Sequence, residues 1–303
     1  MIISKLMIKS LVAKYKTLFV FGAVRQSLKP FLLHNIILYM SNPTFVIDCD
    51  DKRNEYIYAM LEKRGFGVIK MAFDNIFDAE GRYIFLFAPA ARITIETAER
   101  LPKGSKIFCT DCCNNEVKRK LKKERRVSVF NYFDDENLAV RNAMLTAEGV
   151  LAKIIIETDR SIAGLNVLVL GGGRVGKCVA ASLRNNGSSV SIVTRRADEY
   201  ALIPLFADVA YSFEEVDKIL HSFDVIINTV PSKILNKKRL SLLKKHCFVL
   251  DLASKPGGVD SDAASKLRIN AAAYLNVPGK IAPKSAAEIL LDSILKRVFV
   301  EIQ

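Results

Sequence analysis

The sequence predicts an α/β protein of two domains, each built around a parallel β-sheet. Three observations support this fold class. In the second half of the chain, short apolar runs alternate with stretches of helical periodicity, which is typical of a doubly wound parallel sheet. A turn with three spaced glycines at 171–176 joins the first of these runs to a helical stretch. The N-terminal part repeats the alternation more faintly, which predicts a second, smaller α/β domain.

The N-terminal α/β domain is predicted to span residues 1–134, as the domain for a substrate or a partner. Its predicted strands are Leu18–Gly22, Phe45–Asp48, Gly67–Lys70, Tyr83–Phe87, Ile107–Cys109 and Val127–Phe130. A helical stretch to about Met40 follows the first strand. Gly22 lacks the two further glycines of a nucleotide-binding turn, so we assign no nucleotide to this domain.

A connecting helix and the second domain are predicted over residues 135–283. The helical pattern from Asp134 to Asp159 is too long for a loop, and we expect it to line the cleft between the domains. The predicted strands that follow are 167–170, 189–194, 224–228, 247–251 and 272–275. The predicted helices lie near 174–186, 197–206, 213–221, 235–244 and 259–267. A last helix, in residues 284–303, is predicted to pack back onto the N-terminal domain.

The glycine turn predicts a dinucleotide site. Gly171, Gly173 and Gly176 have the G-x-G-x-x-G spacing between a strand and a helix. In that arrangement the first glycine makes the turn, the second admits a pyrophosphate and the third lets the helix pack closely. We therefore predict a Rossmann domain; a merely flexible turn is the alternative. The predicted cofactor contacts of the turn are Gly171, Gly172, Gly173, Arg174, Val175 and Gly176.

The residues after the second strand of this domain favour NADP over NAD. Thr194, Arg195 and Arg196 stand where a ribose 2′-OH usually meets a carboxylate and a 2′-phosphate meets arginine. The nearest carboxylates, Asp198 and Glu199, come a few residues late. We predict that the three residues bind NADP, with NAD as the alternative cofactor. Helix capping or solvent exposure is the alternative role of the arginines.

Later loops at strand ends supply further candidates, because ligands bind at the carboxyl ends of such strands. We predict cofactor contacts by Asn228, Thr229, Val230 and Pro231, with a plain turn as the alternative. Ser254 and Lys255 are predicted to project into the cleft before a turn at 256–258. Lys284 and Ser285, at the start of the last helix, are predicted to hold a substrate carboxylate; a solvated lysine and a helix N-cap are their alternative roles.

The candidate catalytic residues are Lys284, Ser254, Lys255 and Glu148. Glu148 could accept a proton if the connecting helix faces the cleft, and surface exposure is its alternative. The three histidines of the chain all lie at or before residue 246. Their positions disfavour a 2-hydroxy-acid dehydrogenase that uses a late histidine as its base.

Composition limits the class of protein. The net charge of +13 suits an anionic substrate and a phosphorylated cofactor. The basic run at 118–126 is interpreted as a solvated helix face rather than a nucleic-acid site, because no nucleic-acid motif accompanies it. The six cysteines are expected to be reduced, and no metal site is expected. Without a membrane-spanning or signal segment, we expect a soluble, cytoplasmic protein.

Several segments together resemble the family of the dipicolinate synthase A-subunit. They are Thr146–Gly149, the glycine turn at 171–176, Ile227–Ser232, Asp251–Gly258 and Ala282–Lys284. The resemblance covers about residues 140–300, and Asp251–Gly258 is its most specific part. In the N-terminal domain, only the strand to Gly22 and Arg25-Gln26 match. The chain departs from the family pattern at 21–24, 145, 172 and 275–276.

The resemblance implies oxidation of dihydrodipicolinate to dipicolinate, at a CH–CH bond, with NADP or NAD as hydride acceptor during sporulation. It implies a flavoprotein-like second subunit, and we expect a homo-oligomer. The implied substrate contacts are Thr146, Ser254, Lys255, Gly257, Lys284 and Ser285. One alternative is another Rossmann dehydrogenase of a small carboxylate, related to shikimate or methylenetetrahydrofolate dehydrogenases. The other is a non-catalytic NADP-binding sensor or scaffold subunit.

Overall fold

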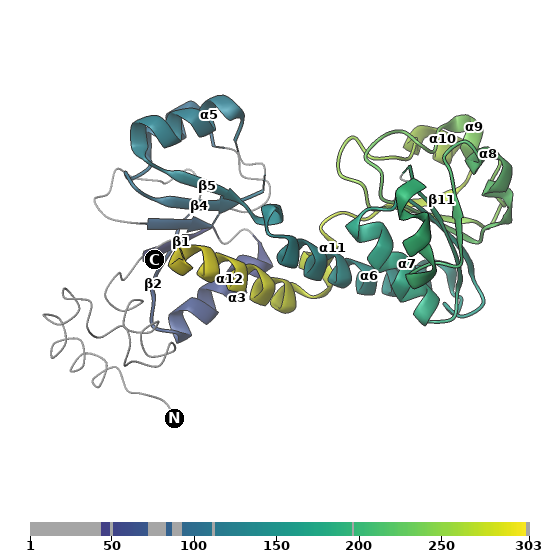
Figure 1. The fold of residues 1–303 in the computed structure, drawn as a ribbon, viewed down its shortest axis with the longest axis horizontal. Coiled ribbons are helices and arrows are strands. Elements are labelled where there is room, and N and C mark those ends of the chain that lie inside the picture. The colour runs from purple at the N-terminus through teal and green to yellow at the C-terminus, as the bar shows by residue number, and fades with distance from the viewer. Residues whose placement is uncertain are drawn as a thin grey trace, which may run out of the picture. The chain divides into compact units, whose positions relative to one another are not determined.

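The computed structural model describes residues 44–48, 51–71, 83–86, 93–110, 113–195 and 197–300. Figure 1 shows the course of the chain, which divides into two compact units. The first unit comprises residues 1–132 and 291–303, and the second comprises residues 133–290. The predicted strand Leu18–Gly22, the helix after it and Arg196 lie outside the described residues.

In its described part, the first unit is built on a five-stranded parallel sheet of order β2-β1-β3-β4-β5. The strands are β1 (Thr44–Ile47), β2 (Gly67–Lys70), β3 (Tyr83–Leu86), β4 (Lys106–Cys109) and β5 (Ser128–Asn131). The helical segments are α3 (Lys52–Lys63), α4 (Ile95–Arg100), α5 (Asn115–Lys120) and η3 (Leu121–Arg125), and η4 (Tyr132–Asp134) crosses the boundary to the second unit. Each of these strands lies within one residue of a predicted strand.

Local sequence explains where three of these helices begin. Asp51, Thr94 and Asn114 precede α3, α4 and α5, and each side chain accepts a hydrogen bond from a backbone N–H of the first turn. Such bonds satisfy donors that the start of a helix leaves without a partner. The helices therefore start at residues that the sequence itself marks.

The cysteines depart from the prediction at one position. Cys113, Cys178 and Cys247 are free, whereas Cys109, at the end of β4, is disulfide-bonded. The expectation that all the cysteines are reduced is therefore wrong. Composition could not reveal this, because a disulfide forms only where the fold brings two cysteines within bonding distance.

The second unit is built on a six-stranded parallel sheet of order β11-β10-β9-β6-β7-β8. Its strands are β6 (Asn166–Leu170), β7 (Ser189–Val193), β8 (Val209–Tyr211), β9 (Val225–Asn228), β10 (Phe248–Asp251) and β11 (Asn270–Ala273). Counted from β6, this is the 3-2-1-4-5-6 order of the Rossmann fold. The predicted fold class, a two-sheet α/β protein with a C-terminal Rossmann domain, is confirmed.

Alternate residues of the strands fill two cores on opposite faces of this sheet. Val167 and Val169 of β6 belong to one cluster, while Leu168 and Leu170 belong to the other. β9 divides in the same way, with Ile227 in the first cluster. Side chains of a strand alternate between its faces, so a run that is apolar at every position indicates burial on both. This is why β6 and β9 were predictable from sequence.

The helices of the second unit follow the prediction less closely than its strands do. The helical segments are α6 (Glu136–Thr158), α7 (Arg174–Asn185), η5 (Ala197–Leu205), α8 (Val216–Ile219), η6 (Leu220–Ser222), α9 (Lys237–Leu240), α10 (Ser261–Lys266), α11 (Val277–Ile281) and α12 (Pro283–Val300), of which residues 291–300 belong to the first unit. The helix predicted at 235–244 is wrong in length, because only four residues form α9. No helix was predicted at α11, whereas α12 begins within one residue of the predicted start of the last helix.

Gly149 of α6 lets α11 pack closely against that helix. A Cβ atom at this position would collide with Val277 Cγ1 and would lie 3.0 Å from Ile281 Cγ1. Both contacting side chains belong to α11. The close approach therefore fixes the chain just before Lys284, one of the predicted site residues.

We predict that Gly149→Ala destabilises the protein although alanine is the better helix former. Overpacking should lower the free energy of unfolding by about 1–3 kcal/mol, which exceeds the gain in helix propensity of about 1 kcal/mol. Urea denaturation measures the change. Gly67→Ala is the control, because the closest atom to a Cβ there is Thr44 Oγ1 at an ordinary 3.4 Å. A Gly149→Ala protein as stable as the wild type would contradict the close packing.

Candidate functional site

A cavity of about 800 Å³ opens at the carboxyl edge of the six-stranded sheet. It is lined by the segments that follow β6, β7, β8 and β9. The lining residues that the sequence assigned to a cofactor are Gly171, Gly172, Gly173, Arg174, Thr194, Arg195, Thr229, Val230 and Pro231. The sheet thus brings together predicted residues from three distant loops, at the edge where doubly wound sheets bind ligands.

The three glycines of the turn have separate structural roles. Gly171 has φ +109, a conformation that favours glycine, and a Cβ there would collide with Thr229 Oγ1. A Cβ at Gly176 would collide with the carbonyl oxygen of Gly171. A Cβ at Gly173 would meet nothing within 4 Å, and Gly173 gives α7 no side-chain cap. The N-terminus of α7 therefore faces open space, which suits an anionic phosphate group.

The charge of the cavity also suits an anion. Among its described lining residues, Arg174, Lys177 and Arg195 are cationic and Glu136 is acidic. Glu136 begins α6, and its carboxylate lies 3.1 Å from the Arg174 guanidinium. The excess of positive charge produces a positive electrostatic potential in the cavity, which attracts a phosphate-rich ligand.

Asn228, a predicted cofactor contact, is engaged within the protein. It is fully buried, and its Nδ2 donates to Asp251 Oδ1 at 2.8 Å and to the Val230 carbonyl at 3.0 Å. Its Oδ1 accepts from the Val230 N–H at 3.2 Å. Asn228 therefore holds the loop after β9 in place through its buried hydrogen bonds. The next three residues, Thr229, Val230 and Pro231, line the cavity.

Asp251 organises the loop that carries Ser254 and Lys255. Besides the Asn228 amide, its buried carboxylate accepts hydrogen bonds from three backbone N–H groups of its own loop. Those donors are Ala253 (3.1 Å), Gly258 (2.8 Å) and Val259 (3.2 Å). One carboxylate thus fixes both ends of the loop, and the loop bends between them at a cis Lys255-Pro256 bond and at Gly257, with φ +84.

The remaining predicted site residues lie outside the cavity lining. Ser254, Lys255, Glu148, Lys284 and Ser285 are exposed. No described contact brings them together, so their roles stay predictions.

Three further predicted site residues, Thr146, Val175 and Gly257, make contacts within the fold. Thr146 is buried, and its hydroxyl donates to the Asn142 carbonyl one turn back in α6 (2.9 Å). Val175 packs against the core that contains Val179. Gly257 donates its N–H to the Ser254 carbonyl (2.8 Å). None of the three lines the cavity at the carboxyl edge.

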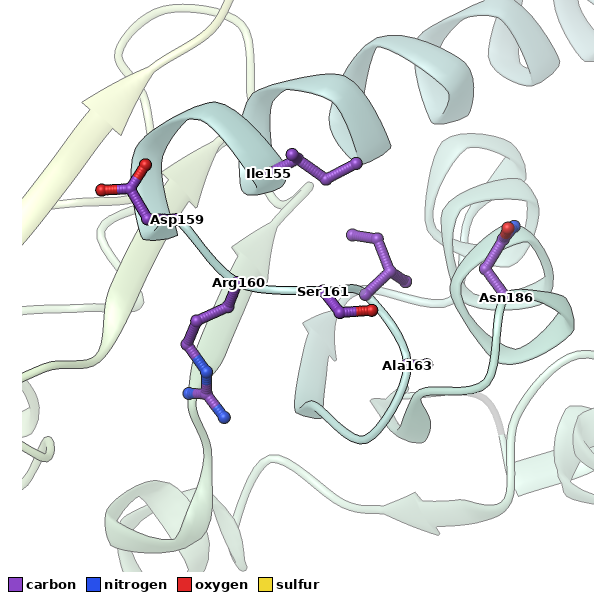
Figure 2. Close-up of a pocket in the computed structure, with 7 residues that line it drawn as sticks. Ile155, Asp159, Arg160, Ser161, Ala163 and Asn186 are labelled. Atoms are coloured by element: carbon purple, nitrogen blue, oxygen red, sulfur yellow. The ribbon is translucent and has the colours of Figure 1, made fainter.

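A second cavity, of about 550 Å³, lies at the opposite, amino edge of the same sheet (Figure 2). Ile155 and Asp159 line it from the end of α6, and Asn186 from the end of α7. Two helix C-termini meet here, and their dipoles disfavour an anion. Arg160 lies 3.6 Å from the Asp224 carboxylate, which offsets its charge. We therefore do not assign the dinucleotide to this cavity.

Sequence reasoning missed four residues of the first cavity besides Glu136: Val140, Lys177, Cys178 and Phe213. Phe213 follows β8, a strand of three residues too short to stand out as a pattern. Burial raises the pKa of the Cys178 thiol, which disfavours a thiolate nucleophile there. Among the described residues, no cluster of His, Cys, Asp and Glu could hold a metal, and no helix could cross a bilayer.

The second half of the chain is similar to the NAD-binding domain of known dehydrogenases. Residues 141–266 match the family model "D-isomer specific 2-hydroxyacid dehydrogenase, NAD binding domain". The chain is 36% identical over 171 residues to the dipicolinate synthase A-subunit of Bacillus subtilis (strain 168), covering 56% of this chain and 57% of that protein. The crystal structure of the dipicolinate synthase A-subunit from Bacillus halodurans matches with a TM-score of 0.75 at 28% identity, covering 85% of this chain and 98% of that one. The chain is a homologue of the dipicolinate synthase A-subunit.

This homologue is also similar to shikimate dehydrogenase (NADP(+)) of Pyrococcus furiosus, at 27% identity over 123 residues, 40% of this chain and 45% of that protein. The matched segments thus span about half the length of these curated relatives. The predicted resemblance is confirmed, and the second half of the chain carries a Rossmann-type NAD-binding domain similar to those of dehydrogenases. The NAD-binding domain implies a nicotinamide dinucleotide as cofactor.

Proposed function

We propose that the chain is an NADP-dependent oxidoreductase that converts dihydrodipicolinate to dipicolinate. The observation that carries the proposal is the cavity at the carboxyl edge, with its glycine turn and cationic lining, in a homologue of the dipicolinate synthase A-subunit. The reaction removes a hydride and a proton from the dihydropyridine ring, which becomes aromatic. When bound, the cofactor accepts the hydride.

NADP is proposed rather than NAD because of the residues at the end of β7. Arg195 lines the cavity there, whereas Glu136, its acidic lining residue, begins α6. A carboxylate after the second strand favours a free ribose 2′-OH, and arginine favours a 2′-phosphate. The relative from Pyrococcus furiosus is named as an NADP(+) enzyme, which supports the same choice. Arg196 was predicted to act with Arg195 and lies outside the described residues.

For the substrate, we propose that exposed cations and hydroxyls bind the two ring carboxylates. Lys255 and Ser254 lie on the loop that Asp251 organises, and Lys284 and Ser285 lie in the first turn of α12. Ammonium and hydroxyl donors form charge-assisted hydrogen bonds with carboxylates. Glu148, exposed on α6, is the proposed proton acceptor.

The similarity to the dipicolinate synthase A-subunit of Bacillus subtilis also bears on the partner that we propose for this chain. That protein is named as one subunit of its enzyme, which supports a second subunit here. We propose that this second subunit is flavoprotein-like. We further propose a cytoplasmic homo-oligomer that acts in sporulation.

The decisive experiment is to incubate the protein with dihydrodipicolinate and NADP, with and without the second subunit. We expect dipicolinate and NADPH to appear in equal amounts, because one hydride leaves the ring for each molecule oxidised. Ultraviolet absorbance measures both products. Shikimate in place of dihydrodipicolinate is the control, and it should give no NADPH. NADP binding without dipicolinate under either condition would contradict the proposal and favour a non-catalytic NADP-binding subunit.

A further inference from the structure

Two cationic side chains of the cavity at the carboxyl edge rest on phenylalanine rings. The guanidinium carbon of Arg195 lies 5.2 Å from the centroid of the Phe213 ring. The ammonium nitrogen of Lys177 lies 5.6 Å from the centroid of the Phe206 ring. Both distances lie within the range of about 6 Å over which a ring face attracts a cation. Arg195, Lys177 and Phe213 line the same cavity.

The two rings are anchored on opposite faces of the six-stranded sheet. Phe206 packs against the core on one face, and Phe213 packs against the core on the other. Phe213 comes two residues after β8, whose last residue, Tyr211, accepts a hydrogen bond from the Thr194 N–H at 3.2 Å. The segment after β8 therefore lies beside the end of β7. One phenylalanine ring is anchored on each face of the sheet near this point.

A ring positions a cation without neutralising its charge. Arg174 shows the contrast, because its guanidinium lies 3.1 Å from the Glu136 carboxylate. Within the described residues, the partner found for Arg195 is the Phe213 ring and not a carboxylate. Stacking on a ring face leaves the in-plane N–H donors of a guanidinium directed at an incoming anion. Such a cation is suited to a phosphate monoester, which presents three acceptor oxygens.

We propose that Arg195 and Lys177 form a two-cation site for the ribose 2′-phosphate of NADP, and that Phe213 and Phe206 are the positioning residues that set the preference for NADP over NAD. This inference rests on the proposed function, which takes NADP as the cofactor, and it assigns roles to three residues outside the glycine turn and the end of β7. Each ring restricts the conformations of its cation before the ligand arrives. Such preorganisation lowers the entropic cost of binding.

The test uses two fragments that differ only in the 2′-phosphate, namely 2′,5′-ADP and 5′-AMP, titrated calorimetrically into the intact protein. Arg195→Ala and Lys177→Gln should each weaken 2′,5′-ADP binding about tenfold, through the lost charge-assisted hydrogen bonds. Phe213→Leu and Phe206→Leu should each weaken it about fivefold. In all four variants, the affinity for 5′-AMP should fall less than the affinity for 2′,5′-ADP. Phe213→Tyr, which keeps the ring, should bind like the wild type.

Matched controls outside the cavity are Lys218→Gln and Phe133→Leu, which should leave both affinities unchanged, and melting temperatures show whether each variant is folded. A folded Phe213→Leu protein that loses no affinity for 2′,5′-ADP, or loses as much for 5′-AMP, would overturn the inference alone. A wild type that binds both fragments equally would overturn it together with the NADP assignment. If the predicted selectivity holds while no dipicolinate is formed, the inference stands and the proposed reaction fails.

Discussion

Replacing Gly176 by alanine is expected to weaken dinucleotide binding strongly and to destabilise the second unit. The added methyl group would collide with the carbonyl oxygen of Gly171, which is backbone and cannot rotate away. The start of α7 must then move away from β6. The N–H groups at the helix N-terminus would no longer be positioned to bind a phosphate in the cavity. We expect NADP affinity to fall about 100-fold, the size of a lost set of charge-assisted hydrogen bonds. The free energy of unfolding should fall by about 1–3 kcal/mol.

Gly173→Ala is the matched control for this prediction. Its methyl group would meet no atom within 4 Å, so the stability should change by less than about 1 kcal/mol. NADP binding should still weaken, because the methyl group would occupy the space in front of the helix N-terminus. Calorimetric titration with NADP and urea denaturation separate the two effects. Wild-type NADP affinity in the Gly176→Ala protein would show that the turn does not hold the cofactor.

The second large effect is expected from Asp251→Ala. The variant removes a buried carboxylate that accepts four hydrogen bonds, from the Asn228 amide and from the N–H groups of Ala253, Gly258 and Val259. A buried donor left without a partner costs about 1–3 kcal/mol. Partial relaxation of the exposed loop will offset some of this cost. We expect the free energy of unfolding to fall by about 3 kcal/mol or more, measured by urea denaturation.

Asp251→Ala also tests whether the loop of Ser254 and Lys255 acts on the substrate rather than on the cofactor. Because Asp251 fixes the loop of Ser254 and Lys255, we expect Asp251→Ala to raise the KM for dihydrodipicolinate more than the KM for NADP. Asp262→Ala is the control, since that carboxylate is exposed in the first turn of α10 and should change stability by less than about 0.5 kcal/mol. A loss of stability no larger than that of the control would contradict the role given to Asp251.

The local patterns of the sequence were sufficient for the strands and the glycine turn. β6 and β9 were predictable because their interior positions are all apolar, as expected of a strand buried on both faces. The turn was predictable because its three glycines have the G-x-G-x-x-G spacing, and two of them, Gly171 and Gly176, stand where a Cβ atom would collide with neighbouring atoms. β8 was missed because three residues are too few to show a period, and α11 was missed because Pro278 and Gly279 are typical of a loop.

The sequence by itself determined the Rossmann-type sheet, the dinucleotide turn and the family to which the chain is similar. These features depend on neighbouring residues, so they can be read along the chain. Only the tertiary structure decided that Asn228 bonds to Asp251, that Cys109 is disulfide-bonded, and that Arg195 rests on Phe213. The order of strands in the sheet sets contacts such as Asn228 to Asp251, because it places side by side residues that are far apart along the chain.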